Sequence, residues 1–478
     1  MARRRTLLLS SVAALAALGA VGAALAPSWQ RPRISGAAGF GDLPPLPVPP
    51  AAPADPRAPV TTDVTVPVAG TALHATVHAP AGGGRHPAVV LVHGGGAATR
   101  AALTDQADRL ARSGIVALVY DKRTVGYSFV RRDYDRLADD AVALARVLRG
   151  RSDVDPQRNG LWGVSEGGWV VPLAAAREPA LSFLILVNAP TMTPGAQLSW
   201  AIDDRLRRQH APAGARRLAA RAIAMGGTGY TDHDPLPALR GITQPVLALY
   251  GADDRAVPPA QSARILLDTV TTPCTVRFFP GADHGMKVGD RYADGYHDTM
   301  VSWIAGLPGT AVSTVAGAVP VQADAASTPP VPPWGRAPVV AAAYGTLVVG
   351  AVTALVAARR ARRTTPEPGR PVAWRAVRRV AWAALATGVG LNVGVAALVG
   401  LGFADAPPIV SQAVWLLLRA GAVGAVLLAV VATADLLRAR GSGAPSGGAV
   451  AVAGAAAGVA TAAALGLAAY WELFAPRW

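Results

Sequence analysis

Four long apolar stretches near the C-terminus constrain the fold of this 478-residue chain more than any other feature. They cover residues 337–358, 380–404, 409–434 and 449–470. At a rise of about 1.5 Å per residue, each can cross a hydrocarbon core of about 30 Å as one helix. Helices buried in a large soluble domain are the alternative, but four such stretches in succession favour a membrane. We therefore expect residues 337–478 to form an all-α region of four transmembrane helices.

Arginines predict how these helices are oriented. The connection over residues 359–379 is rich in arginine, whereas the next connection contains Asp405 and two prolines. Loops rich in arginine tend to stay in the cytoplasm, so residues 359–379 are expected on that side. The last connection, with Arg438 and Arg440, is expected on the same side.

Residues 1–26 fit either a cleaved signal peptide or an uncleaved signal anchor, because arginines at 3–5 precede an uncharged stretch. Residues 24–26 resemble a cleavage site, whereas Pro27 after them favours the uncleaved anchor. With the N-terminal arginines inside, the chain between this span and residue 337 is expected on the extracytoplasmic side. The predicted location is the cell membrane, and the lipid bilayer is a predicted partner.

The net charge of +15 does not indicate nucleic acid binding. Most of the excess lies beside the apolar stretches, where arginine orients helices, and the central part of the chain is almost neutral. The single cysteine, Cys274, excludes an intrachain disulfide and a metal site built from cysteines. The histidines show no metal-ligand spacing, so neither a metal nor another cofactor is predicted.

Arg419 is an exception within the third apolar stretch, because it is expected near the middle of the bilayer. An unpaired charge there costs at least about 2.5 kcal/mol, so a polar partner is expected. Asn392 on the preceding span is the nearest candidate along the sequence. Two interpretations remain open: a functional arginine, or a tilted span from which Arg419 reaches an interface.

Two proline-rich segments, residues 27–58 and 309–336, are predicted to be extended spacers. They leave residues 59–308 as one domain. Short apolar runs alternate there with helical patterns, which predicts an α/β fold with a mostly parallel sheet and helices on both faces. The predicted strands are 88–92, 115–120, 159–162, 181–187, 245–250 and 275–279.

The motif G-V-S-E-G over residues 163–167 follows a predicted strand. In a G-x-S-x-G turn, glycines on both sides of the serine allow a tight strand-to-helix turn that exposes the serine hydroxyl. Ser165 is therefore the candidate nucleophile. Glu166 suits the first turn of the following helix, because the helix dipole favours negative charge there.

A nucleophilic serine needs a base and an acid, which follow it in the order Ser, Asp, His in this type of fold. The strand 245–250 leads into Asp253 and Asp254, and the strand 275–279 leads into His284. His284 is the candidate base that takes the proton of Ser165, and an aspartate is expected to hold its imidazole.

The strand 88–92 ends in His93 and three glycines. Small residues let backbone N–H groups approach a developing oxyanion, so the N–H groups of Gly95 and Glu166 are the predicted oxyanion donors. His93 is expected to pack beneath this loop, because the order of the triad calls for a later histidine.

The chain resembles the α/β-hydrolase superfamily in its esterase, serine aminopeptidase and prolyl-oligopeptidase-like branch. The motifs that carry the resemblance are H-G-G-G at 93–96, D-K-R at 121–123, G-V-S-E-G-G-W at 163–169, G-A-D-D-R-A-V-P at 251–258 and D-H-G at 283–285. The resemblance covers about residues 60–307. It implies Asp254 rather than Asp253 as the acid, through a G-x-x-D-x-x-V-P pattern. Thr124 departs from the glycine that usually follows D-K-R.

Residues 189–243 form a long insertion that is expected to be a small helical cap over the site. Its arginines either contact an anionic substrate or form a solvated face, and the second interpretation is favoured. The predicted function is hydrolysis of a small-molecule acyl substrate, most simply a carboxylic ester, through an acyl-serine intermediate. A peptidase or thioesterase on the same triad, and a non-catalytic membrane binding module, remain alternatives.

Overall fold

The computed structural model of the chain describes residues 2–26, 29–34, 40–47, 49, 54–128, 130–226, 230–320, 322, 324–364, 371–441 and 448–475. The chain forms two compact units. The sheet unit consists of Arg31–Ala201 and Thr228–Ser327, and the helical unit consists of Met1–Gln30, Ile202–Gly227 and Thr328–Trp478. Neither unit is therefore one continuous stretch of the chain.

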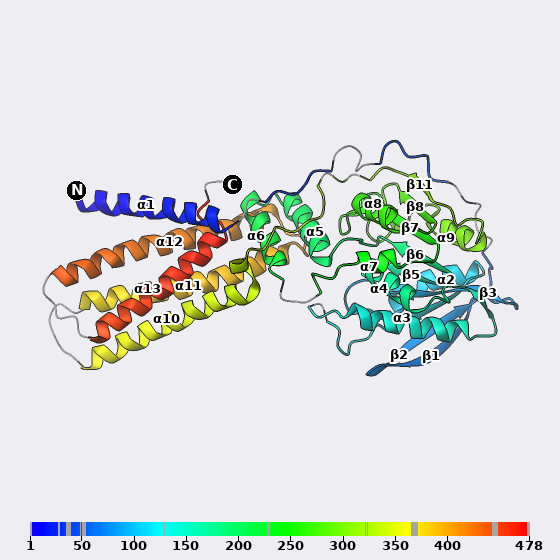
Figure 1. Ribbon diagram of the computed structural model, residues 1–478, viewed down its shortest axis with the longest axis horizontal. Helices are drawn as coiled ribbons and strands as arrows, with labels where there is room; N and C mark the ends of the chain where they lie inside the picture. The colour runs from blue at the N-terminus through cyan, green and yellow to red at the C-terminus, as the bar shows by residue number, and fades with distance from the viewer. Residues whose placement is uncertain are drawn as a thin grey trace. The chain divides into compact units, whose positions relative to one another are not determined.

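The sheet unit contains a nine-stranded sheet in the order β1-β2-β4-β3-β5-β6-β7-β8-β11 (Figure 1). β1 and β2 form an antiparallel hairpin, and β2 is antiparallel to β4. The other neighbouring strands are parallel. The strands are β1 (Val60–Val68), β2 (Thr71–Ala79), β3 (His86–Val92), β4 (Val116–Tyr120), β5 (Val154–Val164), β6 (Phe183–Val187), β7 (Val246–Gly251), β8 (Cys274–Phe279) and β11 (Thr314–Gly317).

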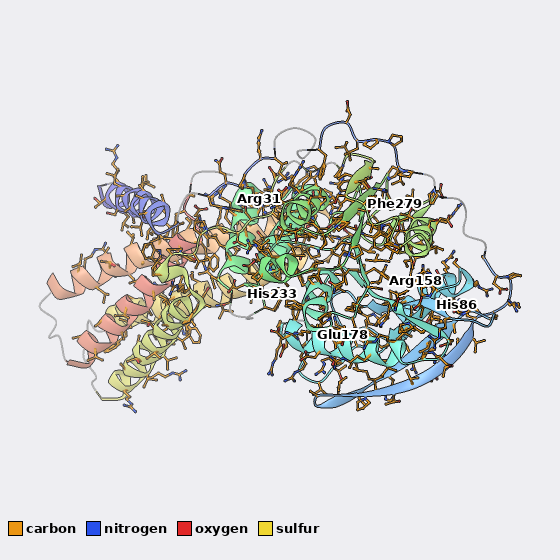
Figure 2. All side chains as sticks on the ribbon, turned by 45° about the vertical axis from the view of Figure 1, so that its right-hand side comes forward. Arg31, His86, Arg158, Glu178, His233 and Phe279 are labelled. Atoms are coloured by element: carbon orange, nitrogen blue, oxygen red, sulfur yellow. The ribbon has the colours of Figure 1, made fainter. Side chains whose placement is uncertain are left out.

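Helices cover both faces of this sheet because the central strands are apolar on both sides. α3 (Tyr134–Arg149), α4 (Gly167–Arg177) and α8 (Pro259–Thr269) share a core with one face. α2 (Thr104–Arg112) and α9 (Tyr296–Ala305) share a core with the other. Figure 2 labels Phe279 at the end of β8, and its ring packs edge-on against Tyr296 of α9 at 5.9 Å between centroids.

All six predicted strands are present, and the α/β fold with a mostly parallel sheet is confirmed. The prediction did not include β1, β2 and β11. β1 and β2 form a hairpin at the sheet edge, with Gly70 at φ +81° in its turn. Most of β1 is exposed, so its sequence lacks the apolar run that marked the central strands.

The description of both proline-rich segments as mere spacers was wrong. Residues 309–336 contain β11, which pairs in parallel with β8 at the edge of the sheet. In the described part of residues 27–58, Phe40 is buried and packs against Phe278 at 5.3 Å between ring centroids. The Gly317 N–H also donates to the Pro44 carbonyl oxygen at 2.9 Å. Single anchoring residues of this kind leave no periodic pattern in a sequence.

The helical unit contains five helices that are long and apolar enough to cross a membrane. They are α1 (Ala2–Leu25), α10 (Ala337–Thr364), α11 (Pro371–Leu401), α12 (Pro408–Gly441) and α13 (Gly448–Tyr470). The four predicted C-terminal helices and the N-terminal one are therefore present. Glycines bring pairs of them close together: a Cβ on Gly350 of α10 would lie 3.0 Å from the Ala456 carbonyl oxygen of α13. Residues 365–370, part of the arginine-rich connection, lie outside the described residues.

The insertion at 189–243 is divided between the units, in contrast to the single cap that was predicted. It forms α5 (Pro194–Arg208), α6 (Ala213–Ala224) and α7 (Leu236–Arg240), and residues 202–227 belong to the helical unit. Leu218 of α6 is buried in one core with Trp415 of α12. The arginines of α6 are not a freely solvated face either, because Arg217 and Arg221 pair with Glu472 at 3.1 Å each.

Arg419 has a different partner from the one predicted. Its Nη2 donates to the carbonyl oxygen of Ala475 at 2.8 Å, and its guanidinium lies 5.9 Å from the centre of the Trp415 ring. Asn392 Nδ2 instead donates to the Gly388 carbonyl of its own helix at 3.0 Å. Asn392 was chosen because it is near Arg419 along the sequence. The acceptor is instead the carbonyl oxygen of Ala475, in the chain after α13.

Candidate active site

Ser165 lies in a tight turn between β5 and α4, and its backbone has a φ of +54°. Such a conformation is strained for a residue with a side chain and is found at functional sites. A Cβ on Gly163 would lie 2.7 Å from the Gly167 carbonyl oxygen, and a Cβ on Gly167 would lie 2.9 Å from that of Val92. Both glycines of the motif are therefore required by close backbone packing around the serine.

Asp254 and His284 lie together at the ends of β7 and β8. His284 Nδ1 and Asp254 Oδ2 are 2.8 Å apart. The other carboxylate oxygen, Oδ1, accepts from the N–H groups of Ala256 at 2.7 Å and Val257 at 2.9 Å. Asp254 is 3 % exposed, whereas Asp253 is exposed. The fixed carboxylate beside the imidazole is therefore that of Asp254.

The electrostatic setting of His284 suits a base. Burial by itself lowers the pKa of His284, but the charge and hydrogen bond of Asp254 outweigh it, and the pKa stands above its usual value of 6.5. Through its bond to Nδ1, the Asp254 carboxylate orients the ring and directs the proton-accepting lone pair to Nε2.

Asn188, which follows β6, connects the loops that carry the candidate residues. Its Nδ2 donates to the His284 carbonyl at 2.9 Å, and its Oδ1 accepts from the Gly251 N–H at 2.8 Å. The preceding residue, Val187, accepts from the Ser165 N–H at 2.9 Å. Asn188 is fully buried and has a φ of +44°, a conformation that asparagine tolerates better than most residues. It was not singled out from the sequence, because a lone asparagine after a strand has no motif.

The glycine loop after β3 lies beside the serine. A Cβ on Gly94 would lie 3.4 Å from the Ser165 Cβ. Among the described residues, the N–H groups of Gly95 and Glu166 donate to no protein acceptor. The Ser165 hydroxyl likewise forms no hydrogen bond within the described part of the chain, so its bond to His284 is not formed in this structure. Catalytic hydrogen bonds often tighten only when substrate binds.

His93 packs beneath the glycine loop, as expected. It is 3 % exposed, and its Nε2 donates to the Tyr120 carbonyl at 2.5 Å. Burial lowers the pKa of His93. Its role here is to fix the end of β3 against the end of β4.

The side chain of Glu166 lies at the centre of a buried charge cluster, a position that the helix dipole did not predict. It is 2 % exposed, and its carboxylate accepts from Lys122 Nζ at 2.5 Å, from Arg132 Nη1 at 2.6 Å and from the Tyr127 hydroxyl at 2.8 Å. Lys122 Nζ also donates to the Gly94 carbonyl at 2.7 Å. We call Lys122, Tyr127, Arg132 and Glu166 the Glu166 cluster.

The Glu166 cluster holds the loop that carries the candidate oxyanion donors. The Tyr127 hydroxyl accepts from the Gly96 N–H at 3.0 Å, and Arg132 Nη1 would be 3.3 Å from a Cβ on Gly95. The residue after D-K-R is Thr124, and the bend of the loop is made instead at Gly126, with a φ of +75°. The D-K-R motif includes Lys122, but the sequence did not predict that Lys122 contacts Glu166, because the fold brings the two residues together.

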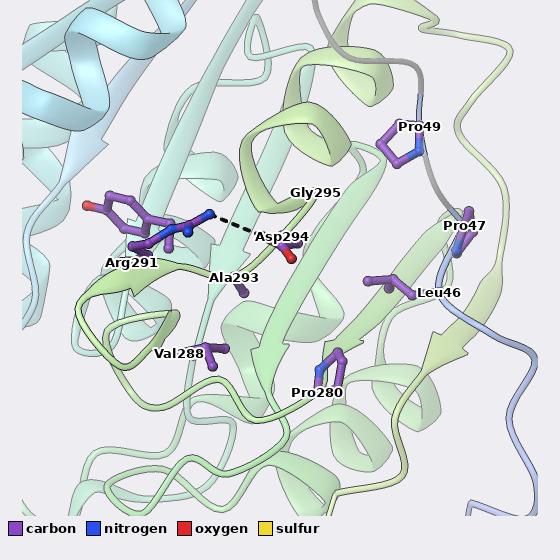
Figure 3. Close-up of a pocket in the computed structure, with 10 residues that line it drawn as sticks. Leu46, Pro47, Pro49, Pro280, Val288, Arg291, Ala293, Asp294 and Gly295 are labelled. Atoms are coloured by element: carbon purple, nitrogen blue, oxygen red, sulfur yellow. Dashed lines mark ion pairs between the residues drawn. The ribbon is translucent and has the colours of Figure 1, made fainter.

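A separate pocket of about 550 Å³ is lined in part by residues between Pro280 and Gly295 (Figure 3). Its walls include Pro47, Pro280 and Val288, and Arg291 forms an ion pair with Asp294 at 4.0 Å. None of the candidate catalytic residues lines it. The pocket is therefore not part of the candidate active site.

Among the described residues, no group of three or more His, Cys, Asp or Glu side chains is placed to hold a metal ion. Cys274 is buried in β8, and burial raises the pKa of its thiol to about 12. Such a thiol is a poor nucleophile, because the thiolate is the reactive form.

Part of the chain is similar to known proteins. Residues 127–309 match the model of the prolyl oligopeptidase family. The uncharacterized protein Rv2307c of Mycobacterium tuberculosis is 31% identical over 204 residues, which are 42% of this chain and 64% of that protein. The acyltransferase drtE of Aspergillus calidoustus is 31% identical over 124 residues, 25% of this chain and 40% of that protein. The chain thus covers less than two thirds of the length of these relatives.

Among solved structures, the acylaminoacyl peptidase of Pyrococcus horikoshii is similar with a TM-score of 0.39 and 15% identity, over 54% of this chain and 43% of that one. The family match, together with the sheet topology and the turn at Ser165, identifies the sheet unit as an α/β-hydrolase domain.

Proposed function

We propose that this protein is a membrane-anchored serine hydrolase that cleaves a carboxylic ester through an acyl-serine intermediate. The observation that carries the proposal is the pairing of His284 Nδ1 with the buried Asp254 carboxylate at 2.8 Å. It occurs in a domain whose serine occupies a strained strand-to-helix turn. A carboxylate bound to Nδ1 of a histidine orients the ring and stabilises its protonated form, so that Nε2 can act as a base.

The reaction proceeds in two steps on these residues. Ser165 Oγ attacks the ester carbonyl carbon while its proton passes to His284 Nε2, and His284 then protonates the leaving alkoxide as the C–O bond breaks. Water next attacks the acyl-serine, giving its proton to His284, and the proton returns to Ser165 as the acid leaves. Asp254 stabilises the imidazolium in both steps without accepting the proton.

The N–H groups of Gly95 and Glu166 are the proposed donors to the oxyanion of each tetrahedral intermediate. Both are backbone groups on loops that the Glu166 cluster connects, so one buried carboxylate stabilises the two halves of the oxyanion site. Losing one such donor typically costs about 2.7–4 kcal/mol of transition-state stabilisation.

A fluorophosphonate probe tests the proposal on the full chain in detergent. We expect labelling of the wild type, loss of labelling in Ser165→Ala, and unchanged labelling in Ser128→Ala, a serine in the loop after β4. Labelling that persists in Ser165→Ala would contradict the triad. Absence of labelling in the wild type would favour a non-catalytic binding module.

Paired substrates decide which acyl bond is cleaved. p-Nitrophenyl esters, aminoacyl anilides and acyl thioesters with matched acyl groups report ester, amide and thioester cleavage, respectively. We expect the highest kcat/KM for the esters. A higher kcat/KM for the anilides would make the protein a peptidase on the same triad, and a higher value for the thioesters would make it a thioesterase.

We also propose that the α/β-hydrolase domain faces the outside of the cytoplasm, from the arginines that flank the apolar helices. Cysteine labelling tests this, because Cys274 is buried and gives little background. A membrane-impermeant maleimide should label Ser128→Cys in intact cells and Thr364→Cys only after lysis. The reverse pattern would place the domain in the cytoplasm.

A further inference from the structure

The helical unit contains a pocket of about 380 Å³ whose two ends differ in chemistry. One wall is α1 from Leu18 to Ala23, together with Ala26 just after the helix. Its charged lining residues, here called the charged end, are Arg217 and Arg221 of α6 and Glu472 in the turn after α13. All of these residues belong to the same compact unit.

The apolar end of the pocket runs along a membrane helix. From Leu18 to Ala23, the residues of α1 that line the pocket span about 7.5 Å at 1.5 Å per residue. α1 packs closely on α13 here, since a Cβ on Gly22 would lie 2.6 Å from the Ala469 carbonyl oxygen. Phe474 closes the same region. This part of the pocket offers hydrocarbon contacts and has the length of a segment of an acyl chain.

The charged end lies where aromatic residues mark a membrane interface. Trp29 lines the pocket, Tyr470 is the last residue of α13, and Trp471 follows it in the turn. Tryptophan and tyrosine are enriched at the level of lipid headgroups. The polar end of the pocket is therefore at headgroup depth, with its apolar end directed into the bilayer.

Among the described residues that line the pocket, two arginines face one carboxylate. Arg217 Nε and Arg221 Nη2 each donate to the Glu472 carboxylate at 3.1 Å, and Arg221 Nη1 donates to the Tyr470 carbonyl at 3.1 Å. Two guanidinium groups thus share one carboxylate. Arg419 contacts the same region, because its Nη2 donates to the carbonyl of Ala475, another residue that lines the pocket.

We propose that this pocket binds an anionic phospholipid, with the phosphate at Arg217 and Arg221 and one acyl chain along α1. A phosphodiester supplies the negative charge that the site lacks, and arginine is well suited to bind it through paired N–H groups. The apolar wall favours a lipid over a free phosphate ion, because a phosphate ion has no hydrocarbon to pack against that wall. The proposal also gives Arg419 a role, since it holds the turn that closes the pocket.

The proposal requires that α1 remain part of the mature protein, because α1 forms one wall. Intact mass measurement of the purified protein tests this first. A mature chain that begins after Ala26 would overturn the proposal.

Native mass spectrometry of the full chain in detergent then compares dioleoyl phosphatidylglycerol with dioleoyl phosphatidylcholine, which have identical tails. We expect about tenfold preference for the anionic lipid, as for one charge-assisted contact pair. Arg217→Gln should abolish the preference and Arg217→Lys should restore part of it. Arg216→Gln is the matched control, because Arg216 pairs with Asp203 at 3.1 Å and does not line the pocket. Equal binding of the two lipids, or equal losses in Arg216→Gln and Arg217→Gln, would overturn the proposal.

Glu472→Gln separates lipid binding from a structural role of the ion pair. It breaks the same pair as Arg217→Gln but removes the carboxylate that competes with the phosphate, so it should strengthen binding of phosphatidylglycerol. If both substitutions weaken binding alike, the ion pair is only structural and the proposal fails.

The acyl chain has its own test. Ala23→Leu fills the apolar end and should weaken binding several-fold, whereas Ala16→Leu, on α1 outside the pocket, should not. Inorganic phosphate at millimolar concentration should leave the lipid bound. If phosphate displaces the lipid and Ala23→Leu has no effect, the site is an anion site and the lipid proposal is wrong.

Discussion

Glu166→Gln tests the buried charge cluster beside Ser165 most severely. The Glu166 carboxylate is 2 % exposed and accepts from Lys122, Tyr127 and Arg132. The substitution keeps the shape of the side chain but removes the negative charge that faces the Lys122 ammonium and the Arg132 guanidinium. The N–H of residue 166, the proposed oxyanion donor, is retained.

The expected loss of stability is large. Removing one partner of a buried ion pair costs about 3–5 kcal/mol. For a domain of about 150–250 residues, each kcal/mol lowers the unfolding temperature by about 2–4 °C. Lys122→Met should cost less, about 1–3 kcal/mol, because Glu166 then keeps Arg132 and Tyr127 as donors. The double variant should cost less than the sum of the two, with a coupling of about 0.5–3 kcal/mol.

Hydrogen exchange of the full chain in detergent measures this effect locally. Two units with separate cores need not unfold in one step, so peptides from β5 and α4 are the appropriate reporters. Asp105→Asn is the control. Asp105 of α2 pairs with Arg109 at 3.1 Å, and both side chains are more than half exposed, so the control should cost about 0–1 kcal/mol in the exchange of α2. If Glu166→Gln costs no more than Asp105→Asn, the cluster does not stabilise the domain as argued.

Three further substitutions test the site. Asp254→Ala removes the group that raises the pKa of His284, so the acidic limb of the pH–rate profile for ester hydrolysis should move to lower pH. The plateau rate should fall about 10⁴-fold. An acidic limb that does not move would refute the pairing of Asp254 with His284. Asn188→Gly keeps the left-handed backbone but loses the bonds to two neighbouring loops, so kcat should fall about 10–100-fold with KM little changed. Gly163→Ala brings a Cβ to 2.7 Å from the Gly167 carbonyl oxygen at the start of α4. It should lower the stability of β5, measured by hydrogen exchange, by about 1–3 kcal/mol. Gly83→Ala is the control and should leave stability unchanged, because no atom lies within 4 Å of the added Cβ.

Strands with continuous apolar runs were predictable, because burial on both faces of a parallel sheet demands such runs. β4 and β6, in which every residue is buried, were found from the sequence for this reason. β1 was not, because its exposed positions carry threonine and aspartate. β11 has only four residues, and its place in the sheet depends on pairing with β8.

The candidate site divides in the same way. Ser165, Asp254 and His284 follow strands in an order that a motif encodes, so local sequence located them. Asn188 and the partners of Glu166 act through contacts between distant loops: Lys122 and Glu166 are separated by 44 positions. A buried carboxylate in the motif was itself a signal, because a charge next to a tight glycine turn needs counter-charges.

The division of the insertion between the two units changes what a truncated domain would do. A fragment over residues 31–327 carries α6 but lacks α12, although Ala215 and Leu218 of α6 are buried in one core with Trp415. In the fragment these side chains face water, so it should self-associate in size-exclusion chromatography with light scattering.

Leu218→Ser should act in opposite directions in the two contexts. In the fragment it removes exposed apolar surface and should reduce self-association. In the full chain it removes a side chain that is 1 % exposed and should destabilise the helical unit by about 2–5 kcal/mol, seen as faster exchange in α6. A fragment that is monomeric before the substitution would show that α6 does not depend on the membrane helices for its burial. The insertion would then belong to the sheet unit, as a cap does.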